Sequence, residues 1–139
     1  MTLENRRINL QREWLLADTC WREAEILLAS GEPRGALTRF YYSAYHAACS
    51  ALLSLGLEAS THSGVRHLFS RHFLKDHLMD PRLARNLASL QQQREDADYE
   101  RDLEISLQQA QWARAEALEV RQAIHSKIRS RSGMRSGLK

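Results

Sequence analysis

Residues 33–55, PRGALTRFYYSAYHAACSALLSL, form the most apolar stretch of the chain and decide the fold that we expect. The polar members of this stretch recur every three or four positions, at Arg39, Ser43, His46, Ser50 and Ser54. Such a spacing places side chains along one side of a helix. The stretch therefore predicts a central helix that is buried on most sides and carries one narrow polar stripe.

A long amphipathic pattern precedes this central helix. Its apolar residues recur in steps of four and three from Leu10 to Leu28. Ser30-Gly31 should end the first helix, because glycine tolerates the left-handed conformation of a helix end, and Pro33 suits the first turn of the next. The short connection between the two predicts an antiparallel helical hairpin.

The rest of the chain also reads as helical. We expect a short helix over about 64–76, a helix from Asp80-Pro81 to about Gln93, and a bend or irregular link over 94–102. Ser106 and Gln109 fit a capping box that opens the last long helix. No alternation of the β type appears. The prediction is an all-α, antiparallel up-and-down bundle of four to five helices, with a single domain over 1–130 and a basic flexible tail over 131–139.

The charge of the chain is concentrated at its C-terminus. Five of the 20 basic residues lie within the last thirteen positions, so residues 1–126 hold 15 basic and 17 acidic residues. The expected domain is thus close to neutral. The tail could touch phosphates at low salt, but such segments are more typically solvated and poorly ordered.

Other features indicate a cytoplasmic protein without a membrane span. Cys20 and Cys49 lie in helical patterns without Cys-x-x-Cys spacing, as expected of reduced cysteines. The first thirteen residues lack the apolar core of a secretion signal. The longest apolar run, 40–57, contains His46 and three serines, which favours a buried helix over a membrane helix.

The first candidate site lies on the polar stripe of the central helix. Arg39, Tyr42, Ser43 and His46 fall within two helical turns of one another. We expect them to form a polar patch with a binding role, whereas Tyr41 and other large apolar residues of this helix are expected to pack in the core. The alternative is that the patch hydrogen-bonds to another helix or to solvent.

Two further polar segments are candidates. Arg94, Asp98 and Tyr99 belong to a mixed charge run, whose alternative interpretation is a solvated link. His62 lies in the segment Thr61-His62-Ser63-Gly64, whose alternative interpretation is a helix cap with an exposed imidazole. The other histidines of this region recur every five residues, which does not align them for a metal. We expect neither a metal nor another cofactor.

Three segments together resemble a known family. ALTRFYYSAYHAACSALLSLG at 36–56, STHSGVRHLFSRHF at 60–73 and QREDADY at 93–99 before a final helix are similar to the HEPN domain, in its branch of small prokaryotic stand-alone proteins. The resemblance covers roughly residues 10–130. It implies a mostly α-helical bundle that forms a homodimer and is often encoded beside a minimal nucleotidyltransferase as a toxin–antitoxin pair.

The resemblance also implies a chemistry. Many HEPN proteins resemble metal-independent endoribonucleases, with an arginine followed by a histidine, four to six residues between them, in a late helix. The RNA 2′-hydroxyl is the nucleophile, the histidine an acid or base, and the arginine the partner of the developing charge. Arg94 matches that arginine, but no histidine follows it. Arg39 and His46 satisfy the spacing in a different helix.

Three functional hypotheses remain open. The working hypothesis is a HEPN component of a toxin–antitoxin or defence-type pair that binds RNA or nucleotide and a nucleotidyltransferase partner, with weak or absent cleavage. The second is an active ribonuclease toxin, in which Arg94 acts with His46 or His62. The third is a non-catalytic structural dimer or adaptor bundle.

Overall fold

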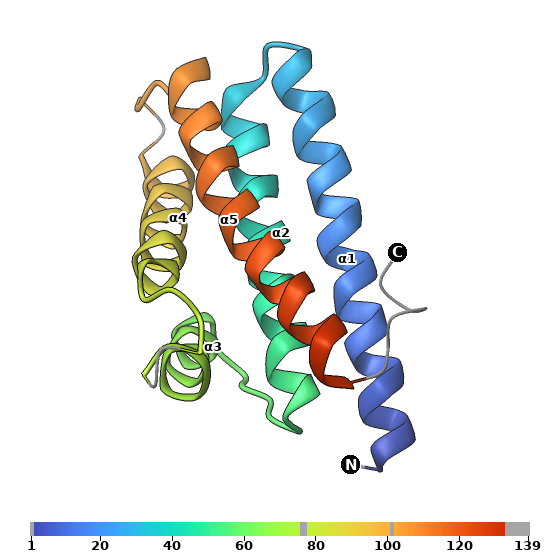
Figure 1. Cartoon of the computed structure of the whole chain (residues 1–139). Helices are drawn as coiled ribbons and strands as arrows, with labels where there is room; N and C mark the ends of the chain where they lie inside the picture. Colours follow the sequence, from blue (N-terminus) through green and yellow to red (C-terminus); the bar gives the residue numbers. More distant parts are fainter. Residues whose placement is uncertain (1, 76–77, 101, 133–139) are drawn as a thin grey trace.

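The computed structural model describes residues 2–75, 78–100 and 102–132, and within these ranges every regular element is helical (Figure 1). The predicted all-α, antiparallel bundle is confirmed. No helix in these ranges is long and apolar enough to cross a membrane. The elements, in chain order, are α1 (Leu3–Ala29), α2 (Pro33–Ser54), α3 (His62–Phe69), the π-helix η1 (Ser70–Leu74), α4 (Arg82–Tyr99) and α5 (Leu107–Ser132).

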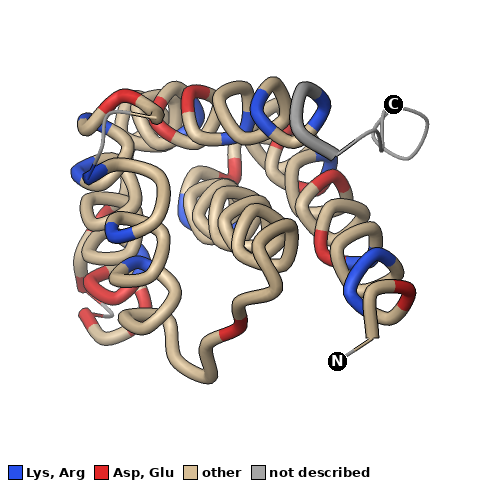
Figure 2. Tube along the Cα trace, turned by 60° about the horizontal axis from the view of Figure 1, so that its bottom comes forward, with Lys and Arg blue, Asp and Glu red and all other residues tan. Residues whose placement is uncertain are grey.

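The helix α2 is the centre of the bundle, as predicted. It contacts α1, α3, α4 and α5, and Figure 2 shows it in the middle of the other helices with little charge along its trace. Phe40 and Tyr41 are buried. Fully buried alanines on α2 and α5, such as Ala44, Ala48 and Ala113, let the helix backbones approach closely.

The connection between α1 and α2 has the predicted glycine end. Gly31 adopts φ 78°, a left-handed conformation that costs glycine little. The N–H of Glu32 donates to the carbonyl of Leu27 at 2.8 Å, and the N–H of Gly31 donates to the carbonyl of Leu28 at 3.2 Å. This is the Schellman pattern of helix ends. It turns the chain directly into α2, so that α1 and α2 run antiparallel.

The helix α4 is longer than predicted. The expected irregular link after Gln93 was wrong for residues 94–99, which continue the helix to Tyr99. Polar side chains one turn apart stabilise this segment in spite of its charge, and Ala97 is buried beneath it. These pairs are Gln91–Glu95, Gln92–Asp96 and Arg94–Asp98. Because the segment is helical, Arg94 is fixed in direction relative to α2.

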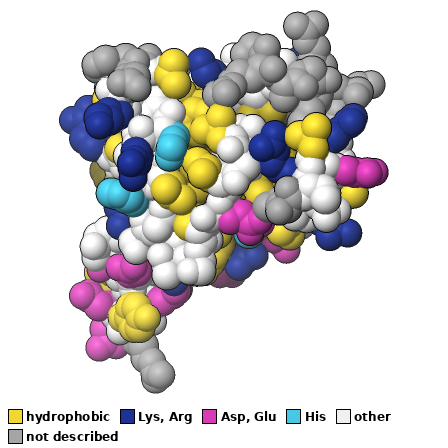
Figure 3. Space-filling model, turned by 90° about the horizontal axis from the view of Figure 1, so that it is seen from below, with side chains coloured by type: hydrophobic (Ala, Val, Ile, Leu, Met, Phe, Trp, Pro, Cys, Tyr) yellow, Lys and Arg dark blue, Asp and Glu magenta, His cyan; other side chains and the backbone are white. Residues whose placement is uncertain are grey.

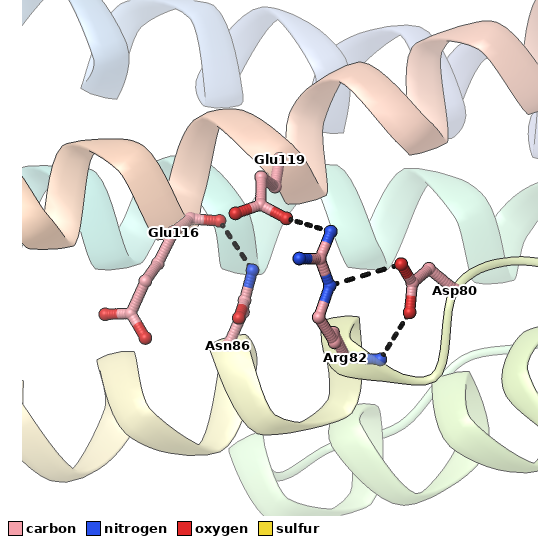
Figure 4. Close-up of polar contacts among 5 residues, drawn as sticks. All are labelled: Asp80, Arg82, Asn86, Glu116 and Glu119. Carbon is pink, nitrogen blue, oxygen red and sulfur yellow. Dashed lines mark hydrogen bonds and ion pairs between the residues drawn. The ribbon is translucent and has the colours of Figure 1, made fainter.

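Polar contacts hold α4 against α5, as Figure 4 shows. Arg82 donates to Glu119 at 3.0 Å and also pairs with Asp80, whose carboxylate accepts the N–H of Arg82. One turn further on, the Asn86 side chain donates to the Glu116 carbonyl at 3.4 Å. The Asp80 carboxylate thus binds the first N–H of α4, and the start of the helix has a defined position.

A single arginine holds the other end of α4. The guanidinium of Arg34, at the start of α2, donates to the carbonyls of Ala97 and Leu103. These carbonyls belong to the last turn of α4 and to the segment that follows it, which lack helical partners for their C=O groups. Arg34 therefore joins the end of α4 to α2.

The helices α3 and α5 begin at defined caps. Thr61 accepts the N–H of Gly64 at 2.9 Å, so α3 starts at His62, and the expected single helix over 64–76 is instead divided into α3 and η1. Before α5, the Ser106 hydroxyl accepts the N–H of Gln109 and the Gln109 side chain accepts the N–H of Ser106, which confirms the capping box. Residues 133–139 of the predicted tail lie outside the described residues.

Candidate functional site

Five polar or aromatic side chains from three helices meet where α2, α3 and α4 come together. Tyr41, Tyr42 and Tyr45 come from α2, His62 from the start of α3, and Arg94 from α4. We call these five residues the aromatic cluster. Their rings and the guanidinium are in mutual contact, so residues separated by more than 50 positions in the chain form one group.

His62 lies against two of the tyrosines. Its ring stacks on Tyr45 with 4.2 Å between the ring centroids and an interplanar angle of 15°. Its Nδ1 shares a hydrogen bond with the Tyr41 hydroxyl. Nε2 of His62 has no hydrogen-bond partner among the described residues. The imidazole is therefore fixed in orientation and keeps one nitrogen for a ligand.

Arg94 lies over the tyrosine rings. Its guanidinium carbon is 5.3 Å from the ring centroid of Tyr41 and 5.8 Å from that of Tyr42, within the range of cation–π attraction. Its side chain is only 17% exposed, and its one ion pair with a described residue is with Asp98 at 2.9 Å. The buried Nε has no hydrogen-bond partner within the described part of the chain. The donors of Arg94 are thus only partly used by the fold.

Burial sets the protonation of the cluster. It lowers the pKa of His62 below the ordinary 6.5, and the nearby positive charge of Arg94 lowers this pKa further. His62 is therefore neutral at pH 7. Burial raises the pKa of Tyr41 and of Tyr45, so both hydroxyls remain protonated and can donate hydrogen bonds.

The structure turns most of the predicted polar patch toward α1 instead. Arg39 pairs with Glu23 at 3.5 Å. The hydroxyl of Ser43 is buried and donates to the Ala17 carbonyl at 2.7 Å. We call Arg39, Ser43 and His46 the α1-facing stripe. It corresponds to the alternative interpretation of the sequence, in which these residues hydrogen-bond to another helix.

His46 closes this stripe at its border with the cluster. Its Nδ1 lies 2.6 Å from a carboxylate oxygen of Glu13 on α1. Its ring centroid is 5.3 Å from that of Tyr45. Of the predicted patch, Tyr42 alone lies under the Arg94 guanidinium. Contact between the predicted patch and the Arg94 guanidinium therefore involves one residue of the four.

The two remaining predicted residues lie at the end of α4. Asp98 pairs with Arg94 and is 45% exposed. Tyr99 is 82% exposed, and no ring contact of the described residues includes it. Asp98 thus orients Arg94, whereas Tyr99 takes no part in the cluster.

Sequence reasoning missed two tyrosines of the cluster and a hydrogen bond that joins α3 to α4. Tyr41 is buried as predicted, but its hydroxyl binds His62, and Tyr45 was not singled out. The two are one helical turn apart, which is the signal that could have joined them. In addition, Nε of Arg66 on α3 donates to Gln91 on α4 at 2.6 Å. This contact holds α3 and α4 together one turn from Arg94.

Comparison with known proteins supplies the family. The HEPN domain model matches residues 12–128. The chain belongs to the HEPN domain family. In this HEPN bundle no histidine follows Arg94 within residues 95–99. The imidazole that shares the Tyr41 ring with Arg94 is that of His62, which comes from a different helix.

Three curated relatives align with parts of this HEPN bundle. A UPF0332 protein of Pyrococcus horikoshii is 43% identical over 51 residues, 37% of this chain and 36% of the relative. A UPF0332 protein of Thermotoga maritima is 31% identical over 83 residues, 60% of this chain and 63% of the relative. A Methanocaldococcus jannaschii protein named "Putative toxin" is 30% identical over 77 residues, 55% of this chain and 52% of the relative. The chain therefore spans less than two thirds of each relative.

Proposed function

We propose that this HEPN bundle is the RNA- or nucleotide-binding component of a toxin–antitoxin or defence-type pair, and that the aromatic cluster is its binding site. One observation carries the proposal: His62 and Arg94, which lie in different helices, both contact Tyr41. A neutral imidazole, a cation and protonated phenols side by side offer the groups that a nucleotide needs.

The chemistry of the cluster suits a nucleotide in two ways. Tyr42 and Tyr45 are partly exposed, so a nucleobase can stack on their rings. The Arg94 guanidinium can then bind a phosphate through charge-assisted hydrogen bonds. Because Glu95, Asp96 and Asp98 follow Arg94 on α4 and Asp98 pairs with it, we expect the phosphate to approach from the side of the tyrosines.

The toxin part of the proposal is supported by the name of the Methanocaldococcus jannaschii relative. The nucleotidyltransferase partner and the homodimer come from the family resemblance. A homodimer would sediment at twice the chain mass of 16.0 kDa. Co-expression with a minimal nucleotidyltransferase encoded beside this chain should give a complex that survives size-exclusion chromatography, and separate elution of the two proteins would remove the partner from the proposal.

A second candidate function, metal-independent RNA cleavage, is favoured by the free Nε2 of His62. In that reaction His62 takes the proton of the RNA 2′-hydroxyl, whose oxygen attacks the adjacent phosphorus. Arg94 stabilises the charge that develops on the phosphorane oxygens. The bond to the 5′-oxygen then breaks, and this oxygen takes a proton from a water molecule, which regains one from protonated His62. The products are a 2′,3′-cyclic phosphate and a 5′-hydroxyl end.

Binding and cleavage can be tested together by incubating the purified protein with labelled single-stranded RNA in the presence of a chelator. We expect Arg94→Ala and Tyr45→Ala each to weaken RNA binding at least about tenfold. Arg114→Ala is the matched control, because Arg114 also lies over an aromatic ring, that of Trp21, and pairs with Glu25. Equal RNA affinity of wild type, Arg94→Ala and Arg114→Ala would contradict the proposal.

The same reactions decide the second candidate function. Cleavage products with cyclic phosphate ends should form in chelator and disappear in both His62→Ala and Arg94→Ala. RNA that stays intact with the wild-type protein while binding to it would exclude cleavage and leave the binding function in place.

A further inference from the structure

A basic groove runs between α3, η1 and α4. Two adjoining hollows of about 470 and 590 Å³ share His67, Ser70 and Ala84 in their walls and together make up the groove. Its charged lining is Arg66, Arg71, Lys75 and Arg85. Figure 3, which views the molecule from below, shows Lys, Arg and His side chains gathered on the left side, with acidic side chains lower in the view.

No acidic side chain is found among the described residues that line the groove. Arg71, Lys75 and Arg85 form no ion pair with any described residue. Asp80 is close enough to Arg85 for the positive charge to lower the pKa of its carboxyl, but both Asp80 oxygens already accept hydrogen bonds from Arg82. The groove therefore has positive charge that no described residue neutralises through an ion pair.

The π-helical turn η1 shapes this groove. The N–H of Lys75 donates to the Ser70 carbonyl, five residues earlier, at 3.0 Å. Such turns are wider than an α-helical turn and are often found at functional sites. Here Ser70, Arg71, Leu74 and Lys75 all line the same hollow. The turn thus presents two cations, one helical turn apart, to the groove.

The groove begins beside the aromatic cluster. Ser63 follows His62 directly in the chain, and Arg66 lies one helical turn after Ser63. Ser63 and Arg66 both line the groove. Arg66 also binds Gln91, which lies three residues before Arg94. Beyond Arg94 the chain is acidic instead, with Glu95, Asp96, Asp98 and Glu100. A polyanion bound at the cluster would therefore be attracted along the groove and repelled from the end of α4.

We propose that the basic groove binds the phosphate backbone of an RNA strand, one nucleotide of which occupies the aromatic cluster. This inference rests on the proposed function and extends it. The ligand of the site becomes a polynucleotide, whose strand leaves the aromatic cluster along the groove. A strand is favoured over an acidic protein segment because Ser63 and Arg66 of the groove lie on the same helix as His62, whose stacked tyrosine partners can bind bases but not a carboxylate. Ser63 and Ser70 add hydroxyl donors for phosphate oxygens.

The test compares a long and a short RNA probe on the full-length protein. The triple variant Arg71→Ala/Lys75→Ala/Arg85→Ala should weaken binding of a single strand of about 12 nucleotides at least about tenfold, and should leave a dinucleotide nearly unaffected. The slope of log affinity against log salt should become shallower by about 2 if three phosphate contacts are lost. The control triple Arg7→Ala/Arg12→Ala/Arg22→Ala removes the same charge from α1, on the other side of the bundle (Figure 1).

The outcomes separate the inference from the proposed function. Equal loss in both triple variants, or none in the groove variant, overturns the groove and leaves the cluster standing if Arg94→Ala still weakens both probes. Loss in the groove variant together with normal dinucleotide binding by Arg94→Ala supports the groove and overturns the cluster. Binding of poly-glutamate with the affinity and salt slope of the RNA would overturn the assignment to RNA and indicate an acidic protein partner.

Discussion

The two polar sides of α2 differ in how their hydrogen-bonding groups are used. On the α1-facing stripe, Arg39, Ser43 and His46 each have a partner on α1. On the side of α3 and α4, the aromatic cluster keeps Nε2 of His62 without a partner among the described residues, and it buries the Nε of Arg94 without one.

This difference separates a structural seam from a binding site. Buried polar groups are normally paired, because an unpaired donor costs about 1–3 kcal/mol. The stripe follows this rule and holds two helices together. The cluster departs from it, and such departures are where ligands bind. A stripe of polar residues in a sequence is therefore a weaker sign of function than polar groups that lack hydrogen-bond partners in the structure.

The largest effect that separates the two sides should come from Arg94. Arg94→Ala should lower RNA affinity about 30- to 150-fold, since a charged hydrogen-bond partner contributes about 2–3 kcal/mol. Its effect on the free energy of unfolding should be smaller than its effect on affinity, because the Asp98 side of its ion pair is 45% exposed and its buried Nε has no partner to lose among the described residues. Fluorescence anisotropy and urea unfolding measure the two. A large loss of stability without loss of affinity would place Arg94 among the structural residues.

The opposite pattern is expected for Arg121 on α5. Its guanidinium donates to Ser43 and to Asp18, and it lies 5.3 Å from the Trp14 ring. Arg121→Ala should lower the free energy of unfolding by about 2 kcal/mol, because it leaves partly buried polar groups unpaired. Urea unfolding measures this change, and RNA affinity below the transition should remain that of the wild type. A loss of RNA affinity in folded Arg121→Ala protein would show that the α1 side of α2 belongs to the binding site.

A smaller and more exact comparison removes one hydroxyl from each side. Tyr41→Phe deletes the partly buried hydrogen bond to His62, and Ser43→Ala deletes the buried hydrogen bond to the Ala17 carbonyl together with the one that Ser43 accepts from Arg121. Each lost hydrogen bond should cost about 1 kcal/mol of folding free energy. Only Tyr41→Phe should also weaken RNA binding, by a few-fold, because it frees the His62 ring. Equal RNA affinities for the two variants would contradict the assignment of binding to the aromatic cluster and of structure to the α1-facing stripe.

The smallest effect concerns pH. The pKa of His62 is lower in the folded than in the unfolded chain, so the unfolded chain takes up a proton first on acidification. The stabilising contribution of neutral His62 is complete above the ordinary pKa of 6.5 and is lost as the pH falls from there through the lowered folded pKa. His62→Gln should lose less stability than the wild type over this interval in urea titrations at several pH values. Parallel pH profiles would contradict the burial of His62.

The sequence predicted most of the fold because the fold depends on local patterns. Helical periodicity located the long helices. Gly31 indicated the turn between α1 and α2, and Ser106 with Gln109 indicated the start of α5. The end of α4 was missed, because a charged segment was expected to leave the helix. Its charges instead pair with one another one turn apart.

The aromatic cluster was harder to predict, because it depends on how three helices pack. His62 and Arg94 are both polar and both were candidates, but spacing along the chain says nothing about two residues in different helices. Tyr41 illustrates the difficulty. It is buried as a core residue should be, and only its hydroxyl contact with His62 reveals a second role.

The central claim is that the site lies on the side of α3 and α4 and not on the side of α1. The most direct test is the RNA affinity of His62→Ala beside that of His46→Ala, with both proteins verified as folded by circular dichroism. We expect at least about a tenfold loss of RNA affinity for His62→Ala and a change below about twofold for His46→Ala. A large loss in His46→Ala with normal binding by His62→Ala would contradict it and move the site to the α1-facing stripe.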